Sequence, residues 1–388
     1  MKADKDRKLL VVCGETSGDA HAAGILDNLK RLNPEVAWKV YGSGGRKLKE
    51  AGAEIMLHVS RLSAIGPGAA LGNLGNYLKL RKSILKRIAA EPPDLAVLVD
   101  FPDFNLPLAR RLKKAGIPVC YFISPQLWAW RKSRIRQIKK YVDLMLVIFP
   151  FEESFYRENG VQAVYVGNPT AARLAGTVEK AASSRDGSPS RPKVALLPGS
   201  RVKEVEQILP VMLRGVEFVS RERDIEFQVF QAPEIKREFL EEIIRPFMTG
   251  HSLEIEVVES DPELLALSDC ALVKSGTSTL EALLLEVPFA MVYRLPRLSY
   301  LLLRPFVRTR TFCLANLVAE RRLVPEFIQG DATAKALGAY IKDLLADREK
   351  QAAQKKAFRA VARRLGSGDA DRRAAEVIVE TFFKPSGI

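Results

Sequence analysis

The chain has 388 residues and a hydrophobic fraction of 47%, which is long for one core and predicts two α/β domains. Its formal charge of +14 indicates an anionic partner: a phosphate-bearing ligand, a nucleic acid or an anionic lipid surface. The cysteines (Cys13, Cys120, Cys270 and Cys313) are far apart, so we expect reduced core residues, and the three histidines lack metal-ligand spacing, which argues against a zinc site. The N-terminal apolar run is too short for a secretory signal, and no apolar stretch could span a bilayer, so we expect a cytoplasmic protein.

Strand-like and helix-like segments alternate along the chain, which is typical of parallel sheets flanked by helices. The strands predicted in the first half are residues 9–13, 38–42, 95–100, 119–123, 144–149 and 163–166. Those in the second half are residues 194–197, 226–231, 253–259, 271–274 and 289–293. Residues 176–192 are rich in Ser, Gly, Pro and charge, which predicts a linker between domains 1–175 and 193–349. The helical tail, about residues 350–388, is expected to pack back on the first domain.

The first predicted strand ends in a small turn that contains two acids, residues 14–19 (GETSGD), and a helix follows. Backbone amides point outward from such a junction, and open α/β sheets bind ligands there. Helix capping by Ser17 and Asp19 is the simpler explanation when the turn is considered alone. Because Glu15 and Asp19 suit a diphosphate poorly, we do not expect this turn to bind one.

The strand at residues 95–100 ends in Asp100, and Asp103 follows after a proline. Desolvation at the end of an apolar run raises a carboxylate pKa toward the working range, so Asp100 is a candidate general base. Helix capping by either acid explains the pattern equally well. Residues 124–131 carry two tryptophans, which line an apolar cleft or belong to the core, and the basic run 131–140 forms a solvated or an anion-facing helix.

In the second half, Gly199, Ser200 and Arg201 lie between a strand and a helix. Close backbone approach, helix amides and a guanidinium together suit a diphosphate. Residues 274–281 repeat this pattern, and Glu281 either holds ribose hydroxyls or interacts with the helix dipole. The turn residues of this second motif are Ser275, Gly276 and Thr277. Neither turn matches the P-loop or the dinucleotide fingerprint, which argues against ATP hydrolysis and NAD chemistry.

Two stretches are candidates for contact with a membrane or with acyl chains. Residues 71–88 predict an amphipathic helix with a basic flank, and residues 294–310 combine five arginines with an apolar run. The predicted apolar contacts are Leu71, Leu74, Leu78, Leu301, Leu302 and Leu303. Packing against a neighbouring domain explains either stretch as well.

Seven motifs in order along the chain resemble the lipid-A-disaccharide synthases, which are inverting glycosyltransferases of family 19 with GT-B architecture. The motifs are residues 14–19, 62–66, 100–105, 123–130, 198–201, 275–281 and 315–317. The resemblance implies two Rossmann-like domains whose parallel sheets face a central cleft. It also implies that the second domain holds most of the UDP and that the final helix crosses back to the first. The first domain would then be the acceptor side, and we place the turn at residues 14–19 there, near Asp100, with its helix-capping role intact.

The resemblance further implies transfer of 2,3-diacylglucosamine from its UDP derivative to the 6-hydroxyl of 2,3-diacylglucosamine 1-phosphate. The products would be UDP and the β-1′,6-linked disaccharide phosphate of lipid A in Gram-negative bacteria, formed without a metal or another cofactor. Asp100 would be the base, beside Glu15 and Asp103, and Arg201 would stabilise the leaving group. The residues expected to bind substrate or UDP are Gly199, Ser200, Arg201, Ser275, Gly276, Thr277, Glu281, Asn316, Ser17 and Asp19.

The chain departs from the family at Asn168, where a histidine is usual, so a neutral donor replaces a titratable one. The resemblance implies peripheral association with the cytoplasmic face of the inner membrane and no nucleic-acid partner, and it leaves a homo-oligomer open. Two alternatives stay open. One is a UDP-sugar epimerase or transferase of the same fold with another acceptor, and the other is a basic nucleic-acid-binding protein.

Overall fold

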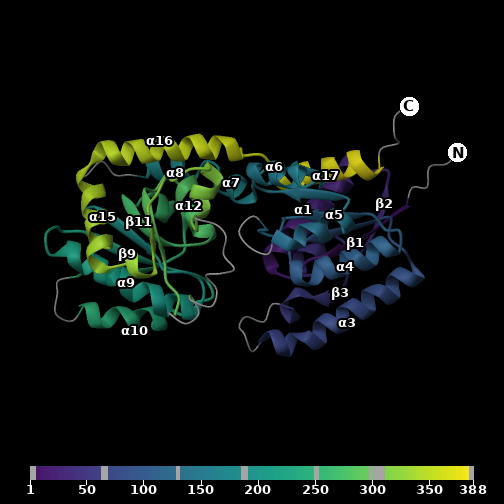
Figure 1. Ribbon diagram of the computed structural model, residues 1–388, viewed down its shortest axis with the longest axis horizontal. Helices are drawn as coiled ribbons and strands as arrows, with labels where there is room; N and C mark the ends of the chain where they lie inside the picture. Colours follow the sequence, from purple (N-terminus) through teal and green to yellow (C-terminus); the bar gives the residue numbers. More distant parts are fainter. Residues whose placement is uncertain are drawn as a thin grey trace. The chain divides into compact units, whose positions relative to one another are not determined.

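The computed structural model describes residues 6–62, 69–127, 132–184, 191–248, 253–296, 300 and 311–383, with residues 69–74 and 132 described by backbone alone. The chain divides into two compact units (Figure 1). Unit 1 comprises Met1–Pro169 and Gly368–Ile388, and unit 2 comprises Thr170–Ser367.

Unit 1 is built on a parallel sheet of seven strands in the order β3-β2-β1-β4-β5-β6-β7. Its strands are β1 (Asp6–Val12), β2 (Ala37–Gly44), β3 (Glu54–His58), β4 (Leu95–Val99), β5 (Val119–Phe122), β6 (Leu144–Val147) and β7 (Ala163–Tyr165). Its helices are α1 (Thr16–Leu32), α2 (Arg46–Glu50), α3 (Ala69–Ala90), α4 (Pro102–Lys114), α5 (Ile135–Tyr141), α6 (Pro150–Glu158) and α17 (Ala370–Ile378). Because β1 pairs with β4, the turns that follow these two strands meet at one edge of the sheet.

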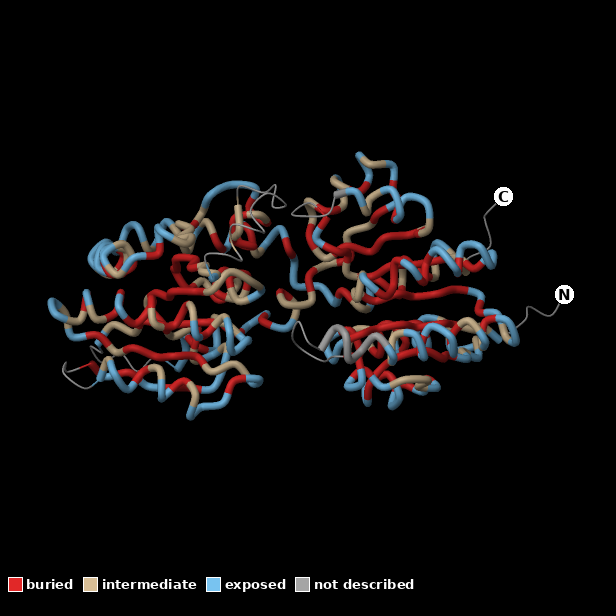
Figure 2. Tube along the Cα trace, turned by 60° about the horizontal axis from the view of Figure 1, so that its bottom comes forward, coloured by how far each residue is buried: buried red, intermediate tan, exposed pale blue. Residues whose placement is uncertain are grey.

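Apolar side chains cover both faces of this sheet, and Figure 2 shows the buried stretches running along its strands. On one face, α1 and α17 pack together over β1 and β4, with Ile25 and Ala374 fully enclosed. On the other face lie α3, α4, α5 and α6, represented in that order by Ile84, Phe104, Ile138 and Tyr156. Burial on both faces explains why the strands read as continuous apolar runs.

Unit 2 has a parallel sheet of six strands in the order β10-β9-β8-β11-β12-β13. Its strands are β8 (Lys193–Leu197), β9 (Glu226–Gln231), β10 (Ile255–Glu259), β11 (Cys270–Lys274), β12 (Phe289–Tyr293) and β13 (Glu326–Ile328). Its helices are α8 (Thr177–Ser183), α9 (Val202–Ser220), α10 (Arg237–Met248), α11 (Pro262–Ala266), α12 (Thr277–Leu284), α14 (Leu314–Ala319), α15 (Ala334–Ala346) and α16 (Arg348–Leu365), while α7 (Pro169–Leu174) stands at the boundary between the units. Within the sheet, β8 and β11 are neighbours, so their following turns also meet at one edge.

The unit boundaries differ from the expected ones in two places. The predicted linker contains α8, whose Thr177 and Ala181 are buried and which packs on α11. Only the part of the tail from Gly368 onward belongs to unit 1. Helix α16 stays with unit 2, because Phe358 packs on Phe289 with ring centroids 5.7 Å apart.

Strands β3 and β13 were not predicted, and the other strands lie where the sequence places them, within one to three residues at their ends. The four cysteines are buried and free, as predicted. Across the described part of the chain, no helix is both long and apolar enough to span a bilayer. The two tryptophans at 128 and 130, and Leu301, Leu302 and Leu303, lie outside the described residues. Leu71 and Leu74 fall in α3, where only the backbone is described, and Leu78 is 46% exposed.

Candidate active site

The turn after β1 and the turn after β4 contact each other through Gly14 and Phe101. A Cβ atom added to Gly14 would stand 2.4 Å from Cγ of Phe101, so only glycine fits beneath this ring. Phe101 also stacks on Phe104, with centroids 5.3 Å apart, and meets Tyr77 edge-on. The structure therefore brings the GETSGD turn and the residues around Asp100 together, as the sequence predicted.

Asp100 and Phe101 both adopt left-handed backbone conformations, with φ of 46° and 53°. Such conformations are costly for residues other than glycine and persist where the surroundings enforce them. Here the carbonyl oxygen of Asp100 accepts hydrogen bonds from the Tyr121 hydroxyl (2.5 Å) and from Nδ2 of Asn105 (2.8 Å). Both donors are fully buried, so the direction in which the Asp100 side chain leaves the backbone is fixed.

Burial, together with the smaller effect of the negative charge of Glu15, raises the pKa of Asp100 from 3.8 to about 6, although a hydrogen bond from the Phe101 N–H opposes both effects. A carboxylate with this pKa is ionised at neutral pH yet basic enough to accept a proton from a hydroxyl group. Among the acids of this turn region, Asp100 is therefore the best suited to act as a base.

The loop after the neighbouring strand β5 is also held in place, in this case by side chains of α6. Ile123 has a left-handed φ of 64°, and the Ser124 hydroxyl donates to buried Glu152 at 2.7 Å. The Tyr156 hydroxyl donates to the carbonyl of Pro125 at 3.2 Å. Sequence reasoning gave no role to Glu152 or Tyr156, because both lie about 30 residues downstream in α6 and no local pattern links them to this loop.

Not every predicted residue of unit 1 is available to a substrate. Asp19 is 2% exposed, and its carboxylate accepts hydrogen bonds from the backbone N–H groups of Gly45, Lys47 and Leu48 at the start of α2. The prediction that Asp19 contacts substrate is therefore wrong for its side chain, because the carboxylate caps the N-terminus of α2 inside the protein. Glu15 and Ser17 are exposed at the N-terminus of α1.

Two further polar residues of unit 1 have internal partners. Asp103 is exposed and forms an ion pair with Arg134, so this member of the basic run faces an acid within the protein. Asn168 is 1% exposed and donates to the carbonyl of Ile148 at 3.0 Å. The amide thus ties the end of β7 to the end of β6 through a neutral hydrogen bond, which requires no titratable group.

In unit 2, a compact charged cluster lies where the turns after β8 and β11 meet. Glu204, in the first turn of α9, pairs with Arg201 at 3.2 Å and with Lys274 at 3.0 Å. Gly199 has a left-handed φ of 116°, and a Cβ atom there would stand 3.0 Å from Glu204 Oε2. Arg201 itself extends outward, with 68% of its side chain exposed. This arrangement of glycine turn, helix start and cations fits the predicted anion site.

In the turn after β11, some side chains are exposed and others form hydrogen bonds within the protein. Thr277 is exposed at the start of α12, after Gly276. The Ser275 hydroxyl donates to the Phe312 carbonyl at 2.8 Å, so it holds the chain before α14 in place. Glu281 accepts a hydrogen bond from Arg173 in α7 at 2.5 Å. Arg173 lies 108 positions away in the sequence, so no local signal could have identified it.

Asn316 is internal, although the resemblance implied that it shapes the cleft. It is 2% exposed; Nδ2 donates to the Val324 carbonyl and to Glu326, and Oδ1 accepts from the N–H groups of Leu323 and Val324. Glu326 also accepts from the backbone N–H groups of residues 312 and 313. All hydrogen-bonding groups of the Asn316 side chain thus join α14 to the segment before β13 and to Glu326. The expected direct contact with substrate is corrected: Asn316 holds these two elements together.

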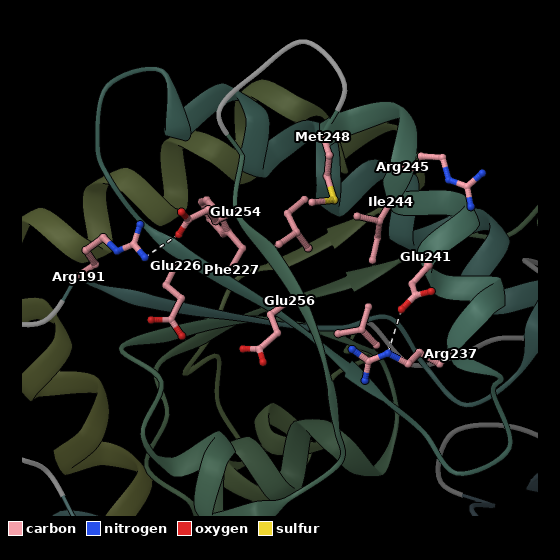
Figure 3. A pocket seen from close by; sticks show the side chains of 12 residues that line it. Arg191, Glu226, Phe227, Arg237, Glu241, Ile244, Arg245, Met248, Glu254 and Glu256 are labelled. Atoms are coloured by element: carbon pink, nitrogen blue, oxygen red, sulfur yellow. Dashed lines mark hydrogen bonds and ion pairs between the residues drawn. The ribbon is translucent and has the colours of Figure 1, made fainter.

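Unit 2 also has a pocket of about 640 Å³ at the opposite, amino-terminal edge of its sheet (Figure 3). Three arginines and four glutamates line it, together with apolar residues such as Ile244 and Met248. Arg191 pairs with Glu254, and Arg237 pairs with Glu241, as Figure 3 shows. Ligands of parallel sheets gather at carboxyl ends, so this pocket is not the candidate active site.

Solved structures of low sequence identity share this fold. A UDP-GlcNAc 2-epimerase from Neisseria meningitidis, solved with UDP-GlcNAc, has a TM-score of 0.60 and 13% identity, covering 96% of this chain and 100% of the other. MurG of Acinetobacter baumannii has a TM-score of 0.57 and 12% identity, covering 97% and 100%. With its two parallel-sheet Rossmann-like units, the chain thus has the GT-B fold of glycosyltransferases and related epimerases.

Sequence comparison is more specific. The family model described as lipid-A-disaccharide synthetase matches residues 9–382. Lipid-A-disaccharide synthases of Anaeromyxobacter sp. (strain K) and Myxococcus xanthus are 42% and 38% identical, each over 96% of this chain and 97% of the relative. That of Geobacter sulfurreducens is 34% identical, over 99% and 100%. The chain belongs to the lipid-A-disaccharide synthase family and is therefore a hexosyltransferase, with a UDP-sugar and a lipid acceptor as the substrate classes of that family.

Proposed function

We propose that this chain transfers 2,3-diacylglucosamine from UDP-2,3-diacylglucosamine to the 6-hydroxyl of 2,3-diacylglucosamine 1-phosphate. The observation that carries the mechanism is the strained, partly buried Asp100, whose pKa is raised to about 6. Asp100 would remove the proton of the 6-hydroxyl as its oxygen attacks the anomeric carbon. The bond from that carbon to UDP breaks, and a β-linked disaccharide forms with inversion.

The turns of unit 2 would bind the leaving UDP. Negative charge grows on the diphosphate as the bond to the sugar breaks, and preorganised donors stabilise that charge without rearrangement. Arg201 is exposed beside Gly199 at the start of α9, and Gly276 and Thr277 begin α12 at the neighbouring strand end. These groups give the anion a cationic site, so the proposal includes activity without a metal ion.

Glu15 and Asp103, which the sequence grouped with Asp100, would act indirectly. Glu15 helps to raise the pKa of Asp100 through its charge. Asp103 holds Arg134. Glu281, oriented by Arg173, would bind the ribose of the donor.

A contact with the cytoplasmic face of the inner membrane is part of the proposal, because both substrates carry acyl chains. Helix α3 supports it: Leu78 is 46% exposed, and Lys79, Lys82 and Lys86 are exposed on the same helix. An exposed leucine beside a row of lysines suits an anionic lipid surface.

The test is the Asp100→Asn variant, assayed for disaccharide formation with both substrates in the presence of EDTA. Loss of a general base costs about 10²- to 10⁴-fold in rate, so we expect a decrease of at least about 100-fold with unchanged UDP affinity. Asp103→Asn is the matched control and should retain most of the activity. Turnover of Asp100→Asn within about threefold of wild type would remove Asp100 from the mechanism, and wild-type activity that is lost only with EDTA would contradict the metal-free part.

A further inference from the structure

Lys274 is the last residue of β11 and lies between the two glycine turns of unit 2. A Cβ atom placed on Gly276 would stand 3.6 Å from its Nζ atom, and one placed on Gly199 would stand 3.4 Å from its Cδ atom. Only 17% of the Lys274 side chain is exposed, so its ammonium group is held at this edge of the sheet and not free in solvent. The lysine thus occupies the position where two anion-binding turns converge.

The charges around Lys274 do not balance. Glu204 pairs with Lys274 at 3.0 Å and also with Arg201 at 3.2 Å, so a single carboxylate serves two cations. The starts of α9 and α12 add further positive potential at the same edge. Lys274 and Glu204 neutralise each other, so the excess positive charge is that of the largely exposed Arg201, which faces solvent at this edge and attracts anions. The cluster is therefore complementary to an anionic ligand.

The geometry also explains why Glu204 is present. Without an anchor, a flexible lysine side chain would lose rotamer entropy on binding its ligand, whereas a salt bridge to Glu204 holds it in place beforehand. Glu204 is itself fixed, because it lies in the first turn of α9 and reaches back over Gly199. Glutamate and lysine together then form a preorganised cation beside the exposed Arg201.

We propose that Lys274 is a second cation of the UDP site and contacts the diphosphate directly, while Glu204 positions it. This inference rests on the proposed function, in which unit 2 binds UDP. The competing explanation is that Lys274 only neutralises Glu204 and contributes to folding alone. The two explanations are separated in a Glu204→Gln background, which has no carboxylate left to neutralise. There a diphosphate contact by Lys274 still affects UDP and not uridine, whereas a neutralising or folding role affects both ligands or neither.

The experiment measures binding of UDP and of uridine by calorimetry to the full-length Glu204→Gln protein and to the same protein with Lys274→Met added. A charge-assisted hydrogen bond contributes about 10- to 100-fold in affinity, so UDP binding should weaken by that factor while uridine binding stays unchanged. The matched control adds Lys193→Met to the Glu204→Gln protein, which removes the same charge at another lysine paired with a glutamate, Glu226 at 3.2 Å. Lys193 begins β8, at the opposite edge of the sheet, so both affinities should stay at the values of the Glu204→Gln protein.

Equal loss of UDP and uridine affinity when Lys274→Met is added, or no loss of either, would overturn the inference. A measurement on the wild-type protein covers the case in which the variant does not fold. UDP should slow acylation of Lys274 by an amine-reactive reagent, detected by mass spectrometry. Uridine should not slow it, and UDP should not change the rate at which Lys193 is acylated. Equal reactivity with UDP and with uridine would count against Lys274, whereas wild-type protein that binds UDP no better than uridine would instead refute the proposed nucleotide site.

Discussion

Replacing Asp100 by asparagine should make unit 1 more stable at neutral pH, although it should abolish activity. The folded protein raises the pKa of this carboxyl group from 3.8 to about 6, and each pKa unit corresponds to about 1.4 kcal/mol. The ionised side chain therefore costs the folded state about 3 kcal/mol above pH 6. Asparagine has a similar shape, carries no charge and tolerates left-handed backbone well, so it removes this cost.

The sign of the pH dependence follows from the direction of the shift. The folded-state pKa of Asp100 is higher than its unfolded value, so folding favours the protonated acid. Well below pH 4 the group is neutral in both states, and the variant should gain nothing from the loss of charge. The gain should grow between about pH 4 and pH 6 and then stay constant.

Guanidinium unfolding followed by tryptophan fluorescence measures this effect in the correct unit. The three tryptophans, at positions 38, 128 and 130, all belong to the sequence range of unit 1, so the signal does not report on unit 2. Asp103→Asn is the control: its exposed carboxylate pairs with Arg134, and loss of that pair should cost about 1 kcal/mol or less. An Asp100→Asn protein no more stable than wild type at pH 8, or equally stabilised at pH 4, would refute the argument from burial.

Two further outcomes are expected. Glu15→Gln should move the acidic limb of the kcat/KM profile to lower pH, because the charge of Glu15 helps to raise the pKa of Asp100; the movement should be smaller than the whole shift, because burial is the larger cause, and an upward movement would contradict the assignment. Leu78→Asp on α3 should reduce co-sedimentation with vesicles that contain anionic lipid and leave UDP affinity unchanged, and undiminished binding to those vesicles would exclude this helix from the membrane contact.

The parts of the molecule that the sequence predicts well are those encoded locally. Buried parallel strands read as apolar runs, and the turns that follow them are marked by glycine and small polar residues, so the edges that carry Asp100 and Gly199 were found. Side-chain partners that are distant in sequence could not be predicted in this way. Asp19 looks like a helix-capping or substrate-binding acid until its partners, 26 to 29 residues later, are seen to enclose it.

The left-handed backbone at Asp100 shows why part of the site could not be predicted. Local propensity tolerates aspartate in that conformation but gives no reason for two successive left-handed residues, of which the second is Phe101. The conformation exists because Tyr121 and Asn105 converge on one carbonyl oxygen, and Tyr121 does so from another strand. Likewise, only the folded chain reveals that Lys274 and Arg201 share Glu204, although Glu204 stands one helical turn after Arg201 in the sequence.

The return of α17 to unit 1 has a consequence for synthesis on the ribosome. Residues 374, 375, 377 and 378 complete the apolar layer over α1, and they are translated after the whole of unit 2. Unit 2 is continuous in sequence and can finish folding first, while the earlier unit 1 waits with one face of its sheet uncovered. Protein truncated after residue 368 should therefore retain a folded unit 2 beside an aggregation-prone unit 1, whose sheet lacks part of its apolar cover.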